Sequence, residues 1–495
     1  MLLLLLGMDQ DRIVAVHNSK SGVLFGTGKA GKGIDVYSLS TNGDSGFITA
    51  GKNHIKFWDL PTGSTAVGEL SAKTGMYHKS MEARTVVSAA YIGSDAMTGM
   101  SDGSLLLWKD RTNTKFVLKA HKAAITSLYS VNEASSSALG VGDGNNGHLV
   151  LSGGKDGFVY IWNAQLAKVW TLDLNLTQPV SLCPQIQSLA TKEGKILIGT
   201  KGSEIYEVNA LNPAETFRWM QGHYEERSEL WGLDVYSKGN KFVTAGDDMT
   251  VRIWDMKGHQ QLHIANVNSK LRSVAFNFDG TNIAVATFEG RIKVLSADLQ
   301  TLIVDVGCAS QWIQCMKYSP DGNLLAVGSH DSTIYLLDTK TYSVQQKCKG
   351  HHSYITGIDF SNDSKYLQST SGDYELLFWD TSNGKQILSA TSLRDVNWAT
   401  FSCPFGWPVQ GIWPPGSDGT DVNSVDRSPD GKLLVTGDDF RRIKLFTYPC
   451  PKEKSKYKES KGHSEHVPNV RFSGDGKNVI SVGGLDKAIL QFIVK

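Results

Sequence analysis

The residues of this sequence that could carry out catalysis are histidines that recur together with a serine or threonine and an aspartate. In a hydrolase triad the histidine takes the proton of the hydroxyl nucleophile, and the aspartate orients the histidine. Such a triad occurs once, in a cleft, with donors for the oxyanion beside it. Here the set recurs at His121, Ser152 and Asp156, at His223, Thr244 and Asp248, at His351, Ser369 and Asp373, and at His463, Ser481 and Asp486. Because the set is repeated, we interpret it as part of a repeated structural unit and expect no enzyme.

Two other patterns resemble ligand sites. His463 and His466 have the spacing of metal ligands, but no acidic or thiol residue accompanies the pair. Residues 142–147 fit the pattern G-x-G-x-x-G, but a dinucleotide site needs a following helix, and a strand and turn follow here, so we predict a hairpin loop. The six cysteines are scattered without a zinc-binding spacing. We therefore expect no metal and no cofactor, and reduced thiols in an intracellular protein.

Short strands separated by tight turns are the elements that position these residues. At seven places an acidic turn residue precedes a large apolar residue by six positions. These pairs are Asp102 and Trp108, Asp156 and Trp162, Asp248 and Trp254, Glu289 and Leu295, Asp331 and Leu337, Asp373 and Trp379, and Asp486 and Phe492. Periods of about 40 to 45 residues, with Gly-His near the start and Trp-Asp near the end, are typical of four-stranded propeller blades. The sequence thus predicts an all-β fold and resembles WD-repeat proteins.

The resemblance to WD-repeat proteins implies structural roles for the repeated set. In that family the aspartate holds a tight turn and accepts a hydrogen bond from the histidine, and a tryptophan packs between blades. Trp162, Trp254 and Trp379 match this tryptophan, and Phe492 replaces it in the last unit. We therefore predict that the four sets hold neighbouring blades together.

A change of pattern near residues 210–216 divides the chain. Its 495 residues suit two domains, and we place the first propeller at residues 1–215 and the second at residues 216–495. The first has about five blades' worth of sequence, which predicts a truncated propeller. The second has six recognisable units and an excess segment, residues 394–421, with strand-like runs at 396–401 and 409–413. We interpret this segment as a shortened seventh blade that closes the ring.

The beginning of the chain is compressed relative to two blades. Residues 12–17, 22–27 and 34–38 are predicted strands of one blade, and residues 46–60 half of the next. The apolar run at residues 2–6 has no basic segment before it and is followed by Asp9 and Asp11, which favours a strand remnant, or an effect of where the chain begins, over a secretory signal. The balance of 50 Lys and Arg against 49 Asp and Glu argues against nucleic-acid or membrane binding.

Three segments near the C-terminus narrow the resemblance to one family. Closely similar stretches close the proteins of the echinoderm microtubule-associated protein-like family: residues 397–425 (NWATFSCPFGWPVQGIWPPGSDGTDVNSV), 433–451 (LLVTGDDFRRIKLFTYPCP) and 462–494. Residues 51–60 (GKNHIKFWDL) and 229–235 (ELWGLDV) support it. The resemblance extends from about residue 10 to the end of the chain.

This resemblance implies a tandem pair of fused propellers whose concave surface contacts tubulin, in proteins of microtubules, the spindle or axonemes. It predicts a non-enzymatic scaffold of the cytoplasm and cytoskeleton that binds tubulin or microtubules. The family's N-terminal coiled coil and basic region have no counterpart here, nor does the hydrophobic motif that helps close the first propeller, so we expect a monomer. The alternative is a WD-repeat adaptor for another assembly, such as a ubiquitin-ligase receptor or a ciliary transport component.

Two groups of loop residues are candidate partner contacts, because packing constrains propeller loops least. The first is an alternating basic stretch, which is either a contact with the acidic surface of tubulin or a solvated loop between blades. Its residues are Lys452, Lys454, Lys456, Lys458 and Lys461. The second is formed by Trp407 and Trp413, with Phe405, which are either interface anchors or packing for a short blade.

Overall fold

The computed structural model describes residues 2–7, 10–43, 46–60, 68–80, 84–131, 133–140, 147–414 and 416–495. In these residues the chain consists of strands, one short α-helix, α1 (Glu133–Leu139), and two 3-10 helices, η1 (Ala390–Leu393) and η2 (Trp407–Ile412). The prediction of an all-β fold is confirmed. No helix in this described part is long and apolar enough to cross a membrane. Residues 142–146, most of the glycine-rich run predicted to be a hairpin loop, lie outside it.

The strands form two compact units, Met1–Gly222 and His223–Lys495. We placed the division between residues 215 and 216, whereas the structure places it after the last strand of the first unit, β20 (Thr216–Gln221). This strand pairs antiparallel with β19 (Glu204–Asn209), from Thr216 opposite Val208 to Gln221 opposite Glu204. Main-chain hydrogen bonds therefore hold residues 216–221 in the first unit.

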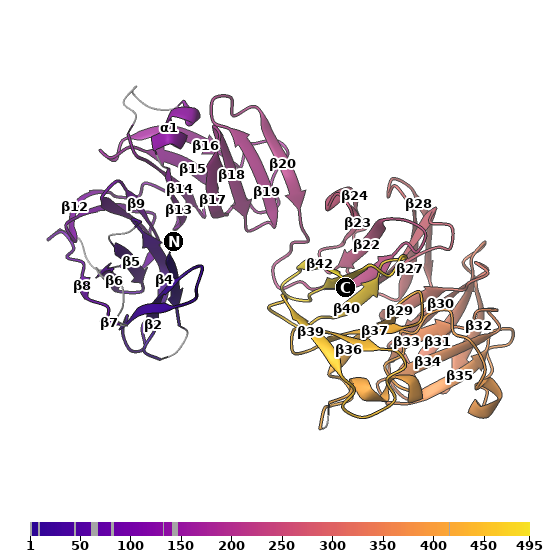
Figure 1. The fold of residues 1–495 in the computed structure, drawn as a ribbon. Helices are drawn as coiled ribbons and strands as arrows, with labels where there is room; N and C mark the ends of the chain where they lie inside the picture. Colours follow the sequence, from indigo (N-terminus) through magenta and orange to yellow (C-terminus); the bar gives the residue numbers. More distant parts are fainter. Residues whose placement is uncertain are drawn as a thin grey trace. The chain divides into compact units, whose positions relative to one another are not determined.

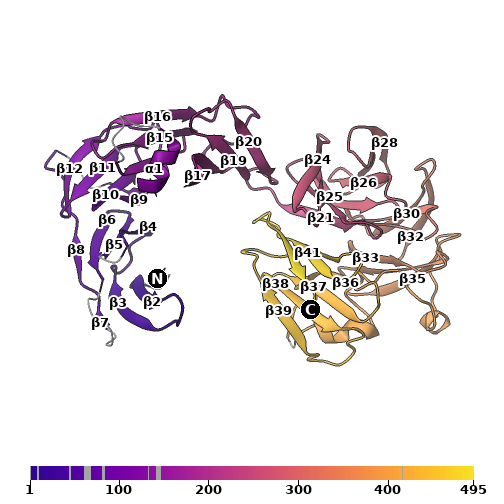
Figure 2. The ribbon, with the colours of Figure 1, turned by 45° about the horizontal axis from the view of Figure 1, so that its top comes forward.

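The first unit contains five four-stranded sheets among the described residues, and they follow one another in chain order (Figure 2). The first sheet consists of β1 (Leu2–Leu6), β2 (Ile13–Asn18), β3 (Leu24–Lys29) and β7 (Gly68–Glu69), and the second of β4 (Val36–Thr41), β5 (Gly46–Gly51), β6 (His54–Asp59) and β8 (Ala72–Thr74). The third consists of β9 (Val86–Ile92), β10 (Asp95–Met100), β11 (Leu105–Lys109) and β12 (Thr112–Val117), the fourth of β13 (Ile125–Val131), β14 (Leu149–Gly154), β15 (Phe158–Trp162) and β16 (Lys168–Asp173), and the fifth of β17 (Ile186–Lys192), β18 (Lys195–Thr200), β19 and β20.

The compression at the start of the chain has a topological cause. We predicted residues 34–38 as a strand of the first blade, but β4 pairs with β5 and is the first strand of the second sheet. The first sheet is completed instead by β1, which pairs with β2, and by β7, which runs parallel to β3. The first 74 residues therefore supply the strands of two four-stranded sheets, which is fewer residues than two blades of about 40 to 45 residues need.

The described residues of the second unit form six sheets. The first consists of β21 (Leu230–Val235), β22 (Lys241–Gly246), β23 (Thr250–Asp255) and β24 (Gln260–Asn266). The next two consist of β25 (Leu271–Phe276), β26 (Asn282–Thr287), β27 (Arg291–Ser296) and β28 (Leu302–Gly307), and of β29 (Ile313–Tyr318), β30 (Leu324–Ser329), β31 (Thr333–Asp338) and β32 (Val344–Lys349). The last three consist of β33 (Ile355–Phe360), β34 (Tyr366–Ser371) and β35 (Leu376–Asp380), of β36 (Val422–Arg427), β37 (Leu433–Asp438), β38 (Arg442–Thr447) and β39 (Tyr457–Lys461), and of β40 (Asn469–Phe472), β41 (Asn478–Val482) and β42 (Ile489–Ile493).

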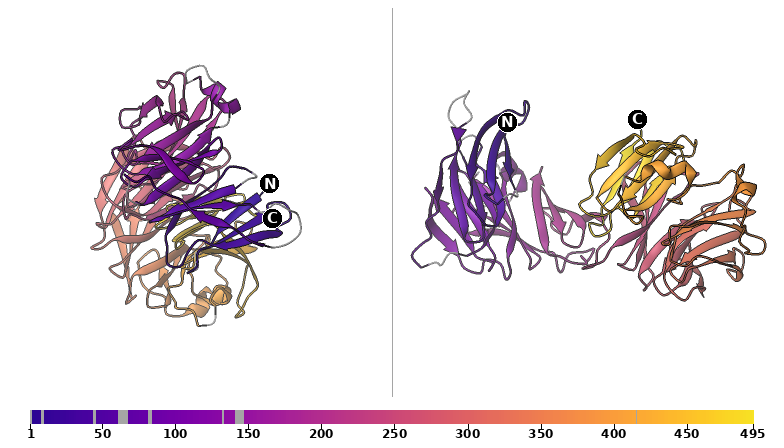
Figure 3. Two further views of the ribbon diagram at one scale, coloured as in Figure 1. Left: turned by 90° about the vertical axis from the view of Figure 1, so that its left-hand side faces the viewer. Right: turned by 90° about the horizontal axis from the view of Figure 1, so that it is seen from below.

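These sheets close into a ring, with the last (yellow) beside the first (Figures 1 and 3). Strand β21 contacts both β25 and β40, and the Leu230 amide donates to the Gly484 carbonyl at 3.0 Å. Phe242 and Trp254 of the first sheet share an apolar cluster with Ile480 and Val482 of the last. Residues from opposite ends of this unit thus complete one core.

Burial along the strands follows their place in each sheet. All residues of β22 except the first are buried, because this central strand has a neighbouring sheet on both faces. The outer strand β24 alternates between exposed and half-buried residues because one of its faces meets solvent. Inner strands therefore read as continuous apolar runs in the sequence, and outer strands are hard to recognise.

The turns between strands share one construction. In the turn after β29 the Ser319 hydroxyl donates to the Asp321 carboxylate at 2.6 Å, and Gly322 has a φ of +74°. Glycine is favourable at such a positive φ, because the Cβ atom of any other residue would be crowded by the backbone. Ser364 occupies the corresponding place after β33 with a φ of +62°. The aspartate, more than the glycine, therefore defines this turn.

The excess segment, residues 394–421, fills the place between β33 and β36, but its described residues form no strand. The predicted strand at residues 396–401 has an isolated bridge between Trp398 and Ser361, and the one at 409–413 lies mostly in η2. Both strand predictions are wrong. Pro408 and Pro414 flank the second run and lack the amide donors that would extend a ladder there, and the Gly411 amide donates instead to the Cys450 carbonyl at 2.7 Å.

A buried aspartate nevertheless connects this segment to the ring as it connects regular sheets. Asp234 of β21 accepts from the Phe276 amide of β25 at 2.8 Å, and Asp426 of β36 accepts from the Phe472 amide of β40 at 2.7 Å. Asp359 of β33 accepts from the amides of Ser402 at 2.9 Å and Cys403 at 3.2 Å. Residues 402–403 therefore receive from Asp359 the contact that the first strand of a following sheet receives elsewhere.

Candidate functional site

The residues of each repeated set meet in a chain of hydrogen bonds, clearest in the first sheet of the second unit. Trp254 Nε1 of β23 donates to Thr244 Oγ1 of β22 at 2.8 Å, and Thr244 Oγ1 lies 2.8 Å from His223 Nε2. His223 Nδ1 lies 2.9 Å from Asp248 Oδ2. The carboxylate also accepts from the backbone amides of Tyr224 and Thr250, both at 3.1 Å. The chain thus joins the blade interior to the turn between β22 and β23.

Burial and charge fix the protonation of this network. Burial lowers the pKa of His223, which keeps the imidazole neutral near pH 7. Burial alone would raise the pKa of Asp248, but His223, Arg252 and the hydrogen bonds outweigh it and lower the pKa to about 2. Because a carboxylate only accepts, His223 carries its proton on Nδ1 and accepts from Thr244 at Nε2.

Two further copies have the same contacts from the histidine to the hydroxyl and to the carboxylate. His121 Nε2 lies 2.7 Å from Ser152 Oγ and Nδ1 lies 3.0 Å from Asp156, while Trp162 donates to Ser152 at 2.8 Å. His463 contacts Ser481 at 2.8 Å and Asp486 at 3.3 Å, and Phe492 replaces the tryptophan. The structure therefore brings together all the residues that the sequence grouped in these two sets.

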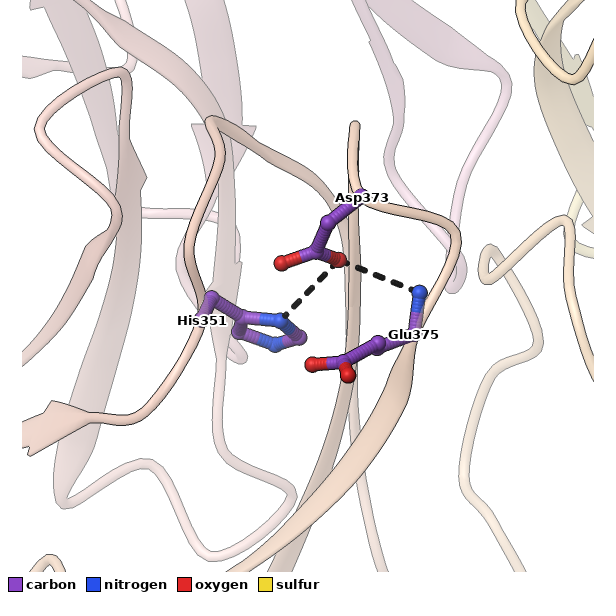
Figure 4. Close-up of side chains that lie close together, drawn as sticks. All are labelled: His351, Asp373 and Glu375. Atoms are coloured by element: carbon purple, nitrogen blue, oxygen red, sulfur yellow. Dashed lines mark hydrogen bonds and ion pairs between the residues drawn. The ribbon is translucent and has the colours of Figure 1, made fainter.

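The set at His351 has two acidic side chains close to the ring, those of Asp373 and Glu375 (Figure 4), and an extra hydroxyl. His351 Nε2 lies 2.7 Å from Ser369 Oγ, and Trp379 donates to the same hydroxyl at 2.8 Å. His351 Nδ1 lies 2.7 Å from Ser371 Oγ, which itself donates to Asp373, so the direct separation from Asp373 is 3.8 Å. Both ring nitrogens of His351 are thus in hydrogen bonds, although Glu375 and Asp373 lie near enough to share a cation with it. This arrangement belongs to the blade network.

Exposure decides between a blade network and a hydrolase triad. The four hydroxyl residues, Ser152, Thr244, Ser369 and Ser481, each have 0% exposure. A nucleophile must reach its substrate, and these oxygens contact only the interior of their blade. We therefore propose a purely structural role for the four sets.

Sequence reasoning missed a variant of this network in the second sheet of the chain. Trp58 donates to Thr49 Oγ1 at 2.8 Å, and Thr49 also contacts His54 Nε2 at 2.9 Å. His54 begins β6, whereas the other histidines precede the first strand of their blade. Burial, with a smaller effect of Lys56, lowers the pKa of His54 to about 4. The sequence signal that could have revealed this variant is a tryptophan four residues after a histidine.

The candidate partner contacts lie on the second unit. Lys452, Lys454 and Lys456 precede β39 and Lys458 lies in it, and all four are exposed. Trp407 begins η2 and is 65% exposed. Trp413 is half-buried, stacks on Phe405 with 5.2 Å between ring centroids, and donates from Nε1 to the Pro404 carbonyl at 3.0 Å. The two tryptophans thus differ: only Trp407 presents most of its surface to solvent.

Comparison with known proteins gives the family of the chain. The model of the echinoderm microtubule-associated protein second beta-propeller matches residues 230–494, and the WD domain, G-beta repeat model matches residues 112–163. The chain belongs to the echinoderm microtubule-associated protein-like family. Both the family predicted from the sequence and the propeller fold are thus confirmed.

Relatives in this family resemble the chain over most of its length. The 77 kDa echinoderm microtubule-associated protein of Strongylocentrotus purpuratus is 38% identical over 91% of this chain. Echinoderm microtubule-associated protein-like 2 of Rattus norvegicus is 36% identical over 90% of this chain. Echinoderm microtubule-associated protein-like 1 of Mus musculus is 35% identical over 90% of this chain. The chain spans 63%, 66% and 52% of these relatives.

Proposed function

We propose that the chain is a non-enzymatic scaffold that binds tubulin or microtubules through loops of its propellers and takes part in organising the microtubule cytoskeleton. The observation that carries the proposal is its family, whose named relatives are microtubule-associated proteins. The burial of the repeated hydroxyls supports a scaffold over a hydrolase. Its place would be the cytoplasm, on microtubules of the spindle or axoneme.

The basic stretch is the surface we assign to this contact. Residues 452–461 contain five lysines and two glutamates, a net charge of +3 in ten residues. Within the described residues, Lys452, Lys454, Lys456 and Lys458 form no ion pair, so their charges face solvent. A single exposed pair contributes about 0.2–1 kcal/mol, so several lysines must act together on the acidic surface of tubulin. Such a contact weakens with added salt.

Charge reversal tests this assignment. Replacing Lys452, Lys454, Lys456 and Lys458 with glutamate should lower the affinity for microtubules in co-pelleting assays about tenfold or more, or ~1.4 kcal/mol. A matched control makes the same change in net charge at four exposed lysines elsewhere in the second unit, Lys257, Lys340, Lys349 and Lys385. The control should bind within about twofold of the unaltered chain. Equal losses in the two variants would show that net charge, and not this loop, governs binding.

A further inference from the structure

The second unit carries a row of aromatic side chains from three of its sheets. Trp231 meets Trp312 edge-on, with 6.4 Å between ring centroids. Trp312 stacks on His330 at 3.7 Å, and His330 stacks on Tyr354 at 4.5 Å. All four side chains line a cavity of about 250 Å³. Sequence patterns within one blade do not reveal this cavity, because each ring comes from a different turn or strand start.

A second hollow, of about 630 Å³, shares a wall with this cavity. Tyr374 and Phe405 line both, and their ring centroids lie 5.6 Å apart. Trp413 lines the second hollow and stacks on Phe405. We name the two together the aromatic groove, lined by Trp231, Trp312, His330, Tyr354, Tyr374, Phe405 and Trp413. Its two parts are too extended for a single side chain and suit several consecutive residues of a ligand.

The charged groups that line the aromatic groove are carboxylates. Asp439 lines the first part and Glu453 the second, and the described lining residues include no lysine or arginine. His330 is uncharged near pH 7, because burial and the nearby Arg272 lower its pKa to about 4. The lining thus favours a cationic over an anionic ligand.

One buried cation lies behind the groove, and its charge is balanced. The guanidinium carbon of Arg272 lies 4.4 Å from the Trp231 ring centroid and 4.8 Å from that of Trp312. Arg272 forms an ion pair with Asp247 at 3.4 Å, and its side chain is 11% exposed. Asp247 and Glu229 both favour its charged form. With these carboxylates and Asp439, the surroundings of the first cavity remain negative overall.

Two ring nitrogens of the groove are buried without a hydrogen-bond partner among the described residues. They are Trp231 Nε1 and His330 Nε2. A buried N–H group without a hydrogen-bond partner is unfavourable, so a ligand that supplies acceptors here gains binding energy. The carbonyl oxygens of a peptide main chain are such acceptors.

We propose that the aromatic groove binds an extended segment of another protein that presents an arginine or lysine side chain. The cationic group lies against the aromatic rings, where the ring quadrupoles attract it, and pairs with Asp439. The main chain of the segment runs on past Tyr374 and Phe405 towards Trp413 and offers carbonyl acceptors to the unpartnered ring nitrogens. An acidic segment is disfavoured by Asp439 and Glu453. This contact differs from the tubulin contact assigned to the lysines of the basic stretch, although Glu453, which lines the second part of the groove, lies within that stretch.

A selection from random peptides tests the proposal with the intact chain. Short linear peptides displayed on phage are selected on the immobilised chain, and the recovered peptides are measured by fluorescence anisotropy. We expect peptides enriched in arginine or lysine, whose affinity falls at least tenfold when that residue is replaced with glutamine. Asp439→Asn should weaken them about tenfold, and Tyr374→Ala, at a residue that is 51% exposed, should weaken them without unfolding the unit.

Asp430→Asn is the matched control. Asp430 lies in the turn between β36 and β37, whereas Asp439 follows β37, so the two aspartates lie at opposite ends of the same strands. The control should bind the selected peptides as the unaltered chain does. Recovery of no peptide, recovery of peptides without basic residues, or equal losses in Asp430→Asn and Asp439→Asn would overturn the proposal.

Discussion

Two serine-to-alanine variants measure how the repeated network stabilises the second unit. Ser369 Oγ contacts two buried groups, His351 Nε2 and Trp379 Nε1, whereas Ser481 Oγ contacts His463 Nε2 alone, since phenylalanine replaces the tryptophan in that sheet. Both substitutions remove one hydroxyl oxygen from a side chain with 0% exposure, so the volume lost from the core is the same. Each buried group left unsatisfied costs about 1–3 kcal/mol. Ser369→Ala should therefore destabilise by about 2–6 kcal/mol, and Ser481→Ala by about 1–3 kcal/mol.

Hydrogen exchange in increasing urea, read by mass spectrometry on peptides that cover β34 and β41, gives the opening free energy of each sheet in the intact chain. The comparison is internal, because the two serines lie in one unit of one protein. We expect the greater loss of protection in Ser369→Ala. If Ser481→Ala loses as much, the tryptophan N–H does not depend on the hydroxyl and the reasoning from unsatisfied groups is wrong.

Two further predictions concern the ring and its response to acid. Asp359→Ala should expose the amides of Ser402 and Cys403, so that residues 397–413 exchange faster while β21 keeps its protection; unchanged exchange would contradict the assigned connection. Stability should also fall with decreasing pH. Folded pKa values of about 4 for His54 and His330 lie below the 6.5 of the unfolded chain, so the unfolded state binds more protons below pH 6.5. The urea midpoint of unfolding should be constant above pH 7 and lower at pH 5. A midpoint that is higher at pH 5 than at pH 7 would refute the reasoning.

Local patterns made the blade network predictable. His223, Thr244, Asp248 and Trp254 lie within one repeat, so their spacing in the sequence reflects their contacts. The spacing of six residues from aspartate to the aromatic residue recurs in the three other sets, although it did not find His54, whose ring reaches Thr49 from another position.

Features that depend on distant residues escaped prediction. The runs at residues 396–401 and 409–413 suggest strands, but the first contacts Asp359 through Thr400 and the second donates to the Cys450 carbonyl through Gly411. Strand β4 belongs to the second sheet because β1 and β7 complete the first one, and β7 lies in the sequence between β6 and β8 of the second sheet. The aromatic groove draws residues from several blades, so no single repeat shows it.

The most direct test of the proposed function is gel filtration of the purified chain alone and with unpolymerised tubulin, followed by microtubule co-pelleting of the same sample. We predict a monodisperse chain that elutes with tubulin or pellets with microtubules in a saturable manner. A monodisperse chain that stays separate from tubulin in both forms would contradict tubulin binding by these propellers and favour an adaptor for another assembly.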